Sequence, residues 1–323
     1  MRVQQLHVGA GSTLGPLTIF PVWTAGPGKL GISTGTHADI AVTELASGAQ
    51  VGKLTVTNNG PRPALLLEGE LLEGGQQHRT CARDVVLGAG ESRDIDTYCV
   101  EAGRWQAGET THRRQGRRAP LNVRAELVSR SEERGGAGRQ DRIWERVRRF
   151  DAARGPSATS SLLDHLDAPR TNRRFDAADA PGPLEGQRGV VIGLGRQPLL
   201  LEVFGTHTLF RRHYSQLVES ALLDVELLPL NLLVAGTMPG QRARDFAAAV
   251  QVMNFGTFDD GLAAVEVRHH GVLGSRNVMR SRNVGGRTGA LEGAGNAVAL
   301  PDRQPELAHL TGWNTKHPLM EIA

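Results

Sequence analysis

Several residue types are scarce in this chain of 323 residues, and each shortage excludes a class of protein. Cys81 and Cys99 are the only cysteines, too few for a disulfide-stapled fold or for a zinc site of their own. Aromatic residues make up 4% of the chain, so leucine, valine and alanine must fill most of the core. The formal net charge of +3 is too small to indicate a nucleic-acid or membrane partner by itself.

Long uninterrupted apolar runs are also missing. The N-terminal segment 1–20 lacks the apolar stretch of a signal peptide. The most apolar later stretch, 221–236, contains Asp224, Glu226 and Pro229, which make a membrane span costly. We therefore expect a soluble cytoplasmic protein without a membrane partner, in which both cysteines are reduced and buried.

The first hundred residues have the pattern of short strands separated by turns. Apolar or β-branched runs alternate with segments that contain glycine, asparagine or proline. The expected strands are 17–23, 39–46, 53–57, 64–72, 78–87 and 92–100. Six strands at this spacing predict an antiparallel sandwich or an open barrel.

The last two of these strands allow a sharper prediction about register. If residues 89–91 form a three-residue loop, Cys81 faces Cys99 and Arg79 faces Glu101. A slip of one residue would separate both pairs, because side chains alternate along a strand. We therefore predict that Arg79 and Glu101 are cross-strand partners.

The remainder of the chain mixes helical and strand patterns. Helices are expected near 123–133, at 139–154, at 157–166, from Thr206 or Thr208 onward, and at 239–254. Further strands are expected at 189–194, 199–204, 261–272 and 297–300. The chain is thus predicted to be one α+β domain over 1–323. It would have a β-rich half at 1–102, an Arg-rich connection with short helices at 103–188, and a mixed half at 189–323.

Arginine is concentrated in one part of this chain. Residues 104–154 contain 14 arginines against 7 acidic residues, a local balance of +7. Phosphate binding uses such arginines, but the acidic residues interleave with them and stacking aromatics are few. We interpret the segment as a charged linker with a solvated helix face, and we do not expect a nucleic-acid partner.

Two segments concentrate the residues that could carry chemistry. LLLEGELLEGGQQHR at 65–79 and CVEAGRW at 99–105 place glutamates among apolar residues, then supply glycine and arginine. A carboxylate removed from water needs a cation or several hydrogen-bond donors. Glu68 and Glu70 are two positions apart and should share one face of a strand. The candidate ligand-binding residues are Glu70, Glu73, Arg79, Glu101, Arg104 and Trp105.

These motifs resemble the ARPP family, named for its association with ADP-ribosylglycohydrolase and with rhodanese/phosphatase-superfamily proteins. The resemblance rests on LTIFPV, TNNGPRPALLLEGELLEGGQQHR, CVEAGRW, QPLLLEVFGTHTLF and HYSQLVESALLD. It covers about residues 15–270 and implies one integrated domain of a bacterial protein. The genomic association in the family name implies a link to nucleotide or ADP-ribose chemistry. It does not define an activity, because association is not a mechanism.

Three functions are compatible with these residues. The first is a pocket for a small anionic or nucleotide-like ligand, in which arginine binds phosphate or carboxylate and Trp105 stacks. The second is a hydrolase whose catalytic residues are drawn from Glu68, Glu70 and Glu101; these carboxylates could also hold a divalent cation. The third is a structural or partner-binding role, with the glutamates in ordinary surface ion pairs. We favour the first, predict no dedicated cofactor or metal, and make no prediction of oligomeric state.

The histidines carry weaker signals. His213 falls on an amphipathic helix and is expected at its surface, while His309 and His317 have no recognisable partner in the sequence. His269 and His270 are adjacent and would point to opposite faces of a strand, which does not suit one metal ion.

Overall fold

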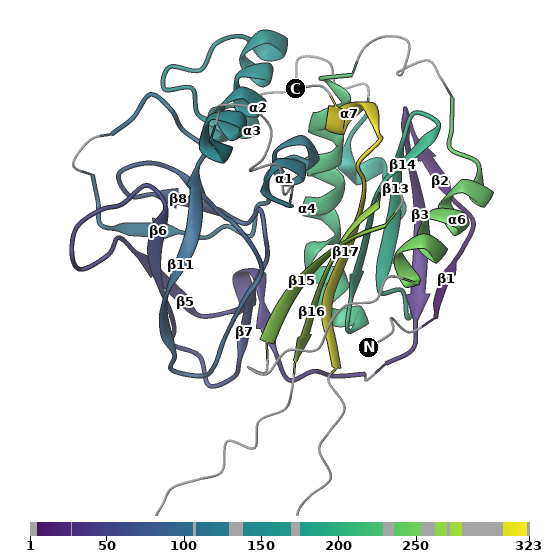
Figure 1. Ribbon diagram of the computed structural model, residues 1–323, viewed down its shortest axis with the longest axis horizontal. Helices are drawn as coiled ribbons and strands as arrows, with labels where there is room; N and C mark the ends of the chain where they lie inside the picture. The colour runs from purple at the N-terminus through teal and green to yellow at the C-terminus, as the bar shows by residue number, and fades with distance from the viewer. Residues whose placement is uncertain are drawn as a thin grey trace, which may run out of the picture.

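The computed structural model consists of a β-barrel and a broad β-sheet with helices packed between them (Figure 1). It describes residues 5–26, 28–105, 108–128, 138–168, 175–228, 236–252, 262–269, 272–279 and 306–321. The prediction of an α+β fold with a β-rich N-terminal half is confirmed. Cys81 and Cys99 are free and buried, as expected.

The barrel is closed and has six antiparallel strands. In order around it they are β11 (Ser92–Cys99), β6 (Lys53–Asn58), β5 (Ile40–Thr43), β12 (Thr111–Arg113), β8 (Leu71–Gly74) and β9 (Arg79–Cys81). Alternate side chains fill the interior, such as Leu54 and Val56 of β6, which are fully buried. The sequence predicts an antiparallel sandwich or an open barrel, and the structure has a closed barrel. Closure leaves none of its six strands with an unpaired edge.

Two of the expected strands are interrupted. The segment 64–72 splits into β7 (Ala64–Leu66) and β8, and the segment 78–87 splits into β9 and β10 (Val85–Leu87). β7 pairs with β10 and with the parallel strand β4 (Ser33–Thr34) in a separate three-stranded sheet.

This interruption changes the register of β9 on β11. Arg79 lies opposite Cys99, and Cys81 lies opposite Thr97. The predicted pairs of Arg79 with Glu101 and of Cys81 with Cys99 are therefore wrong by two positions. The reason is that the chain after β9 leaves to form β10 beside β7, so no three-residue hairpin loop sets the register.

The broad sheet has eight strands, and both ends of the chain contribute to it. Its order is β1 (Leu6–Val8), β3 (Leu17–Thr24), β13 (Gly189–Leu194), β14 (Gln197–Phe204), β17 (Glu306–Asn314), β16 (Val272–Met279) and β15 (Leu262–His269), with β2 (Ser12–Leu14) paired to β3. The predicted hairpin of 189–194 and 199–204 is confirmed as β13 and β14. Because β3 pairs with β13, the chain starts in this sheet, builds the barrel and then returns.

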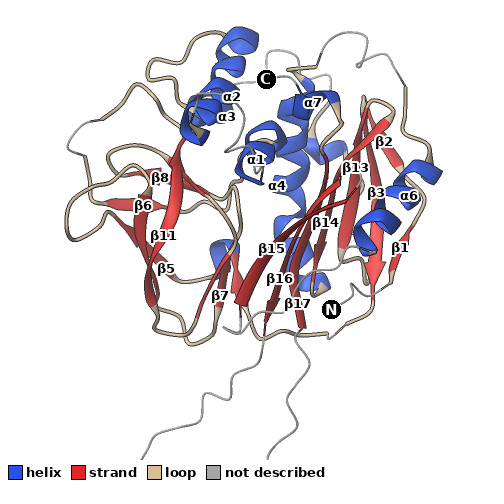
Figure 2. Cartoon of the chain, viewed as in Figure 1, coloured by secondary structure: helices blue, strands red, loops and turns tan. Residues whose placement is uncertain are grey.

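Helices cover both faces of the broad sheet (Figure 2). On one face α4 (His207–Val225) packs Phe210 and its neighbours against side chains that include Ile19 of β3. On the other face α6 (Gly240–Gln251) packs Phe246 against side chains that include Phe20. Adjacent apolar residues of one strand thus point to opposite faces, as expected for a sheet that is covered on both sides.

The remaining helices pack around the barrel and α4. They are α1 (Leu121–Val128), α2 (Arg139–Arg154), α3 (Leu162–Asp167) and α7 (Pro318–Glu321), with 3-10 turns at Gly35–His37 and Ala177–Asp179. The bounds of α2 match the prediction. Within the described ranges no helix is both long and apolar enough to cross a membrane. The strand expected at 297–300 lies outside the described residues.

Candidate functional site

Glu101, which follows Val100 just beyond the end of β11, is bound by Arg104 in a two-point ion pair. Arg104 Nε donates to Oε1 at 2.9 Å, and Nη2 donates to Oε2 at 2.7 Å. The carboxylate also accepts hydrogen bonds from the backbone N–H of His78 at 3.0 Å and from the Thr159 hydroxyl at 2.8 Å. Burial acts to raise the pKa of Glu101, but Arg104 and the other donors bring it below its ordinary value. Glu101 is therefore an ionised carboxylate that protein donors already hold.

Arg79 of β9 lies beside this pair and is completely buried. Its Nη1 donates to Gln77 Oε1 at 3.0 Å, and Gln77 Nε2 donates to the backbone carbonyl of Glu101 at 3.1 Å. The ring centroid of Trp105, a side chain that is 51% exposed, lies 5.8 Å from Arg79 Cζ. Nε and Nη2 of Arg79 have no hydrogen-bond partner among the residues that the structure describes. Two buried donors of one cation are thus left without a protein acceptor, which is rare in folded proteins.

These two nitrogens form the edge of a guanidinium that donates two parallel hydrogen bonds to a carboxylate or phosphate. Elsewhere in this protein the same edge is filled by a glutamate. The pairs are Arg104–Glu101, Arg114–Glu70 and Arg124–Glu68. Burial lowers the pKa of Arg79, but an arginine titrates so far above neutrality that the side chain stays charged. The free edge of Arg79 is therefore a cationic two-donor site.

Glu44, directly after β5, lies in the same end of the barrel. Its Oε1 accepts from the backbone N–H of Gln76 at 3.2 Å and lies 3.2 Å from His112 Nε2. Its Oε2 is buried, and no described residue hydrogen-bonds to it. Burial lowers the pKa of both Arg79 and His112, and the charge of Glu44 opposes that effect in each. Glu44 is therefore close enough to both Arg79 and His112 for its charge to affect their pKa values.

Glu68 and Glu70 do not share a strand face, which corrects the prediction for this segment. Gly69 between them has a φ of +76°, so the chain turns there instead of continuing as a strand. A Cβ at Gly69 would lie 2.7 Å from Arg124 Cγ, so only glycine leaves room for the arginine that binds Glu68. Glu70 is bound instead by Arg114, whose Nε and Nη2 donate at 2.9 and 2.5 Å. Both carboxylates are buried, so neither belongs to a solvated face.

The structure brings only part of the predicted ligand-binding set together. Arg79, Glu101, Arg104 and Trp105 form one group. Glu73 accepts from Arg117 Nε at 2.8 Å and from Gln115 Nε2 at 2.9 Å, and Glu70 has Arg114. Glu70 and Glu73 therefore have cations of their own, which come from the Arg-rich segment.

A second group of buried charges joins the barrel to the broad sheet, and we call it the barrel–sheet charge cluster. Its members are Glu68, Asp84, Arg118, Arg124, Glu202 and His309. Glu202 of β14 accepts from Arg124 Nη2 at 3.1 Å and lies 2.9 Å from His309 Nε2. His309 Nδ1 lies 2.6 Å from Asp84 Oδ2. Burial acts to lower the pKa of His309, but Asp84 and Glu202 raise it to about 9. With His309 protonated, three carboxylates face three cations.

Sequence reasoning missed this cluster. The interpretation of 104–154 as a solvated linker is wrong for Arg118, Arg124 and Arg146, which are buried. His309 has its partners on other elements, so nothing near it in the chain identifies them. One local signal existed, because Glu202 interrupts the apolar run of β14 and a buried charge must be paired.

His213 is also placed differently from the prediction. It is buried in α4, not exposed on the helix surface. Its Nε2 lies 2.8 Å from Thr34 Oγ1, and its ring stacks on Phe204 at a centroid distance of 5.3 Å. Burial lowers the pKa of His213 to about 3, so the ring is neutral at physiological pH.

The carboxylates considered for a divalent cation lie in separate groups. Glu68 is bound by Arg118 and Arg124, Glu70 by Arg114, and Glu101 by Arg104. Across the described residues, no set of three or more His, Cys, Asp or Glu side chains is arranged to hold a metal ion.

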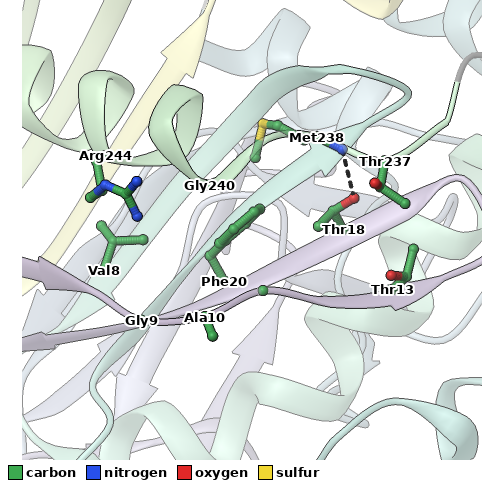
Figure 3. A pocket seen from close by; sticks show the side chains of 11 residues that line it. Val8, Gly9, Ala10, Thr13, Thr18, Phe20, Thr237, Met238, Gly240 and Arg244 are labelled. Atoms are coloured by element: carbon green, nitrogen blue, oxygen red, sulfur yellow. Dashed lines mark hydrogen bonds between the residues drawn. The ribbon is translucent and has the colours of Figure 1, made fainter.

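A cavity of about 440 Å³ lies apart from all these residues, between β1, β3 and the start of α6 (Figure 3). Phe20, Met238 and Arg244 are part of its lining. Thr18 Oγ1 accepts a hydrogen bond from the backbone N–H of Met238 at 3.1 Å, the dashed line in Figure 3. No residue predicted from the two Glu-containing segments lines this cavity.

Residues 5–295 match the family model described as ARG and Rhodanese-Phosphatase-superfamily-associated Protein domain. No curated protein and no solved structure matches the chain. The matched span includes both segments that supply Arg79, Glu101 and Trp105.

Proposed function

The chain belongs to the ARPP family, and we propose that it binds a small ligand that carries an oxyanion, of the nucleotide or ADP-ribose class. The ligand site is the end of the barrel where Arg79, Gln77, Glu101, Arg104 and Trp105 meet, which we call the Arg79 site. The observation that carries the proposal is the two-donor edge of Arg79, buried and without a protein acceptor.

A buried donor that lacks an acceptor destabilises the folded protein by roughly 1–3 kcal/mol. Arg79 has two such donors, so the protein without ligand carries a cost that a bound carboxylate or phosphate would remove. Functional sites often lower the stability of the folded protein in this way, because their groups are held ready for a ligand.

Neighbouring residues fit the same role. Gln77 holds Nη1 of Arg79, which orients the free edge. Arg104 neutralises Glu101, so the Glu101 carboxylate does not compete for Arg79. Half-exposed Trp105 covers the guanidinium and offers a ring face on which a nucleobase can stack.

The geometry favours binding over hydrolysis by the glutamates. A general acid must be protonated near neutral pH, which requires a raised pKa. The pKa of Glu101 is lowered instead, and arginines occupy the carboxylates of Glu68 and Glu70. None of the three is free to transfer a proton to a substrate.

The assignment of the ligand to the nucleotide or ADP-ribose class has its own basis. It rests on the family description, which names association with ARG and the rhodanese-phosphatase superfamily, and on Trp105 beside Arg79. Phosphate suits the free edge as well as carboxylate does. A cytoplasmic location is part of the same proposal.

Binding can be tested by isothermal titration calorimetry of the full chain with ADP-ribose and AMP, comparing the wild type with Arg79→Met. Methionine removes the charge and both free donors but keeps an unbranched apolar side chain in the barrel. We expect at least tenfold weaker binding, because hydrogen bonds to charged groups contribute about 1.5–3 kcal/mol. The melting temperature without ligand should stay the same or rise, because methionine removes two buried donors that have no protein acceptor.

Arg93→Gln is the matched control, since Arg93 is an exposed arginine on β11. It should bind as the wild type does. The proposal is wrong if the wild type binds neither probe. It is equally wrong if Arg79→Met binds normally and melts at a lower temperature, because Arg79 would then be a structural residue.

A further inference from the structure

A second buried group at the same end of the barrel lacks a partner, and its chemistry is opposite to that of Arg79. Glu44 Oε2 is an acceptor with no hydrogen-bonding residue in the described part of the chain. The other oxygen, Oε1, is fixed by the Gln76 backbone and by His112. The carboxylate is therefore held in one orientation, with a defined oxygen left over.

The loop that carries Gln76 is built closely around this carboxylate. Gly75 has a φ of +56°, and a Cβ there would lie 2.9 Å from Glu44 Oε1 and would collide with the His112 ring. Glycine is thus required for the backbone to approach Glu44. The backbone at Gly75 and Gln76 therefore fixes the position of the Glu44 carboxylate.

From these contacts we infer that the ligand carries a hydroxyl or N–H donor near its oxyanion, and that Glu44 Oε2 accepts this hydrogen bond while Arg79 binds the oxyanion. The inference rests on the proposed function. One ligand would then supply partners for both buried groups. Glu44 Oε2 would favour oxyanions that also carry a hydrogen-bond donor over those that carry none. A simple oxyanion would leave Glu44 Oε2 unpaired and bring a second negative charge near it, which is unfavourable in a buried site.

The chemical class that fits is a hydroxylated phosphate, such as the ribose phosphate portion of a nucleotide. Its phosphate supplies two acceptors for the edge of Arg79, and its sugar hydroxyls supply donors for Glu44. A hydroxycarboxylate has the same combination of groups, so the experiment includes both oxyanions.

The test measures binding of two matched pairs of compounds to the full chain by calorimetry. Ribose 5-phosphate is compared with methyl phosphate, which lacks the hydroxylated sugar, and lactate is compared with propionate, which lacks the hydroxyl. For the oxyanion that binds, we expect the hydroxylated compound to bind about tenfold to a hundredfold more tightly, because its hydroxyl meets a charged acceptor. Preference within the phosphate pair assigns the phosphate class, and preference within the lactate pair alone assigns the carboxylate class.

Glu44→Gln separates this inference from the proposed function. The amide oxygen can keep the bonds to Gln76 and His112, which leaves an N–H₂ donor in place of Oε2. The variant should bind methyl phosphate at least as well as the wild type and lose the preference for ribose 5-phosphate. Glu145→Gln, at an exposed glutamate of α2, should keep the wild-type preference.

The outcomes are distinguishable. Equal affinity for both members of each pair in the wild type would overturn the role of Glu44 and leave the Arg79 site intact. A preference that survives in Glu44→Gln would overturn it as well. Binding of none of these compounds, nor of ADP-ribose or AMP, would overturn both proposals, and water would then be the partner of both buried groups.

Discussion

Protonation of His309 should make the stability of this protein depend on pH between about 6.5 and 9. His309 of β17 is buried between Asp84 and Glu202, with its ring nitrogens 2.6 and 2.9 Å from their carboxylate oxygens. These carboxylates outweigh the effect of burial and raise the pKa of His309 to about 9 in the folded protein. In the unfolded chain the pKa returns to about 6.5.

The magnitude follows from this difference. A change from 6.5 to about 9 corresponds to about 3 kcal/mol of stabilisation from the protonated ring. Because the folded-state pKa is the higher one, this stabilisation is fully present below pH 6.5. It decreases as pH rises and is lost above pH 9. His309→Gln lacks it at every pH.

The assay is urea denaturation of the wild type and His309→Gln at intervals from pH 6 to 9.5. The free-energy difference between them should shrink by about 3 kcal/mol over this range, with an unchanged dependence on urea. His37→Gln, at an exposed histidine, is the control and should follow the wild type. A difference that stays constant or grows as pH rises would show that His309 is not protonated in the cluster.

Two backbone predictions test how the elements are built. Gly69→Ala should destabilise the protein by more than Gly90→Ala. Both glycines have positive φ, which costs other residues roughly 1–2 kcal/mol, but only at Gly69 would a Cβ meet Arg124. Equal losses in thermal melting would show that the Arg124 contact does not matter. Thr206→Ala should cost roughly 0.5–2 kcal/mol, because the Thr206 hydroxyl oxygen caps α4, while Thr208→Ala should be nearly neutral. A larger loss of stability from Thr208→Ala than from Thr206→Ala would show that Thr206 is not the N-cap of α4.

The Arg79 site and the barrel–sheet charge cluster use arginine in different ways. In the cluster the cations are matched by carboxylates, which holds the barrel against the sheet. At the Arg79 end of the barrel, the Arg79 guanidinium and the Glu44 carboxylate each keep a group without a partner among the described residues. Arg124 Nη1 of the cluster also lacks a hydrogen-bond partner in the described part of the chain, but the Nε and Nη2 edge of Arg124 is bound by Glu68 and Glu202. The same edge of Arg79 has no acceptor, and this difference supports a ligand-binding role for the Arg79 site.

The sequence by itself determined those features that depend on neighbouring residues. The strand pattern of 17–23, the hairpin at 189–204 and the helix at 139–154 all follow from local periodicity and turn residues, and the structure contains them. The two Glu-containing segments also marked the chain region that holds Arg79, Glu101, Arg104 and Trp105. These are short-range signals, which survive without knowledge of the fold.

Only the tertiary structure decided which arginine meets which glutamate. The chain holds many arginines, and the composition of 104–154 predicts a charged linker with a solvated helix face, because nothing in this segment shows what covers Arg114, Arg118 and Arg124. Their partners depend on the turn at Gly69, and the place of Arg79 depends on the departure of β10 from the expected hairpin. Pairing of charges is a long-range property, because closing the barrel and packing it on the sheet bring together residues far apart in the chain.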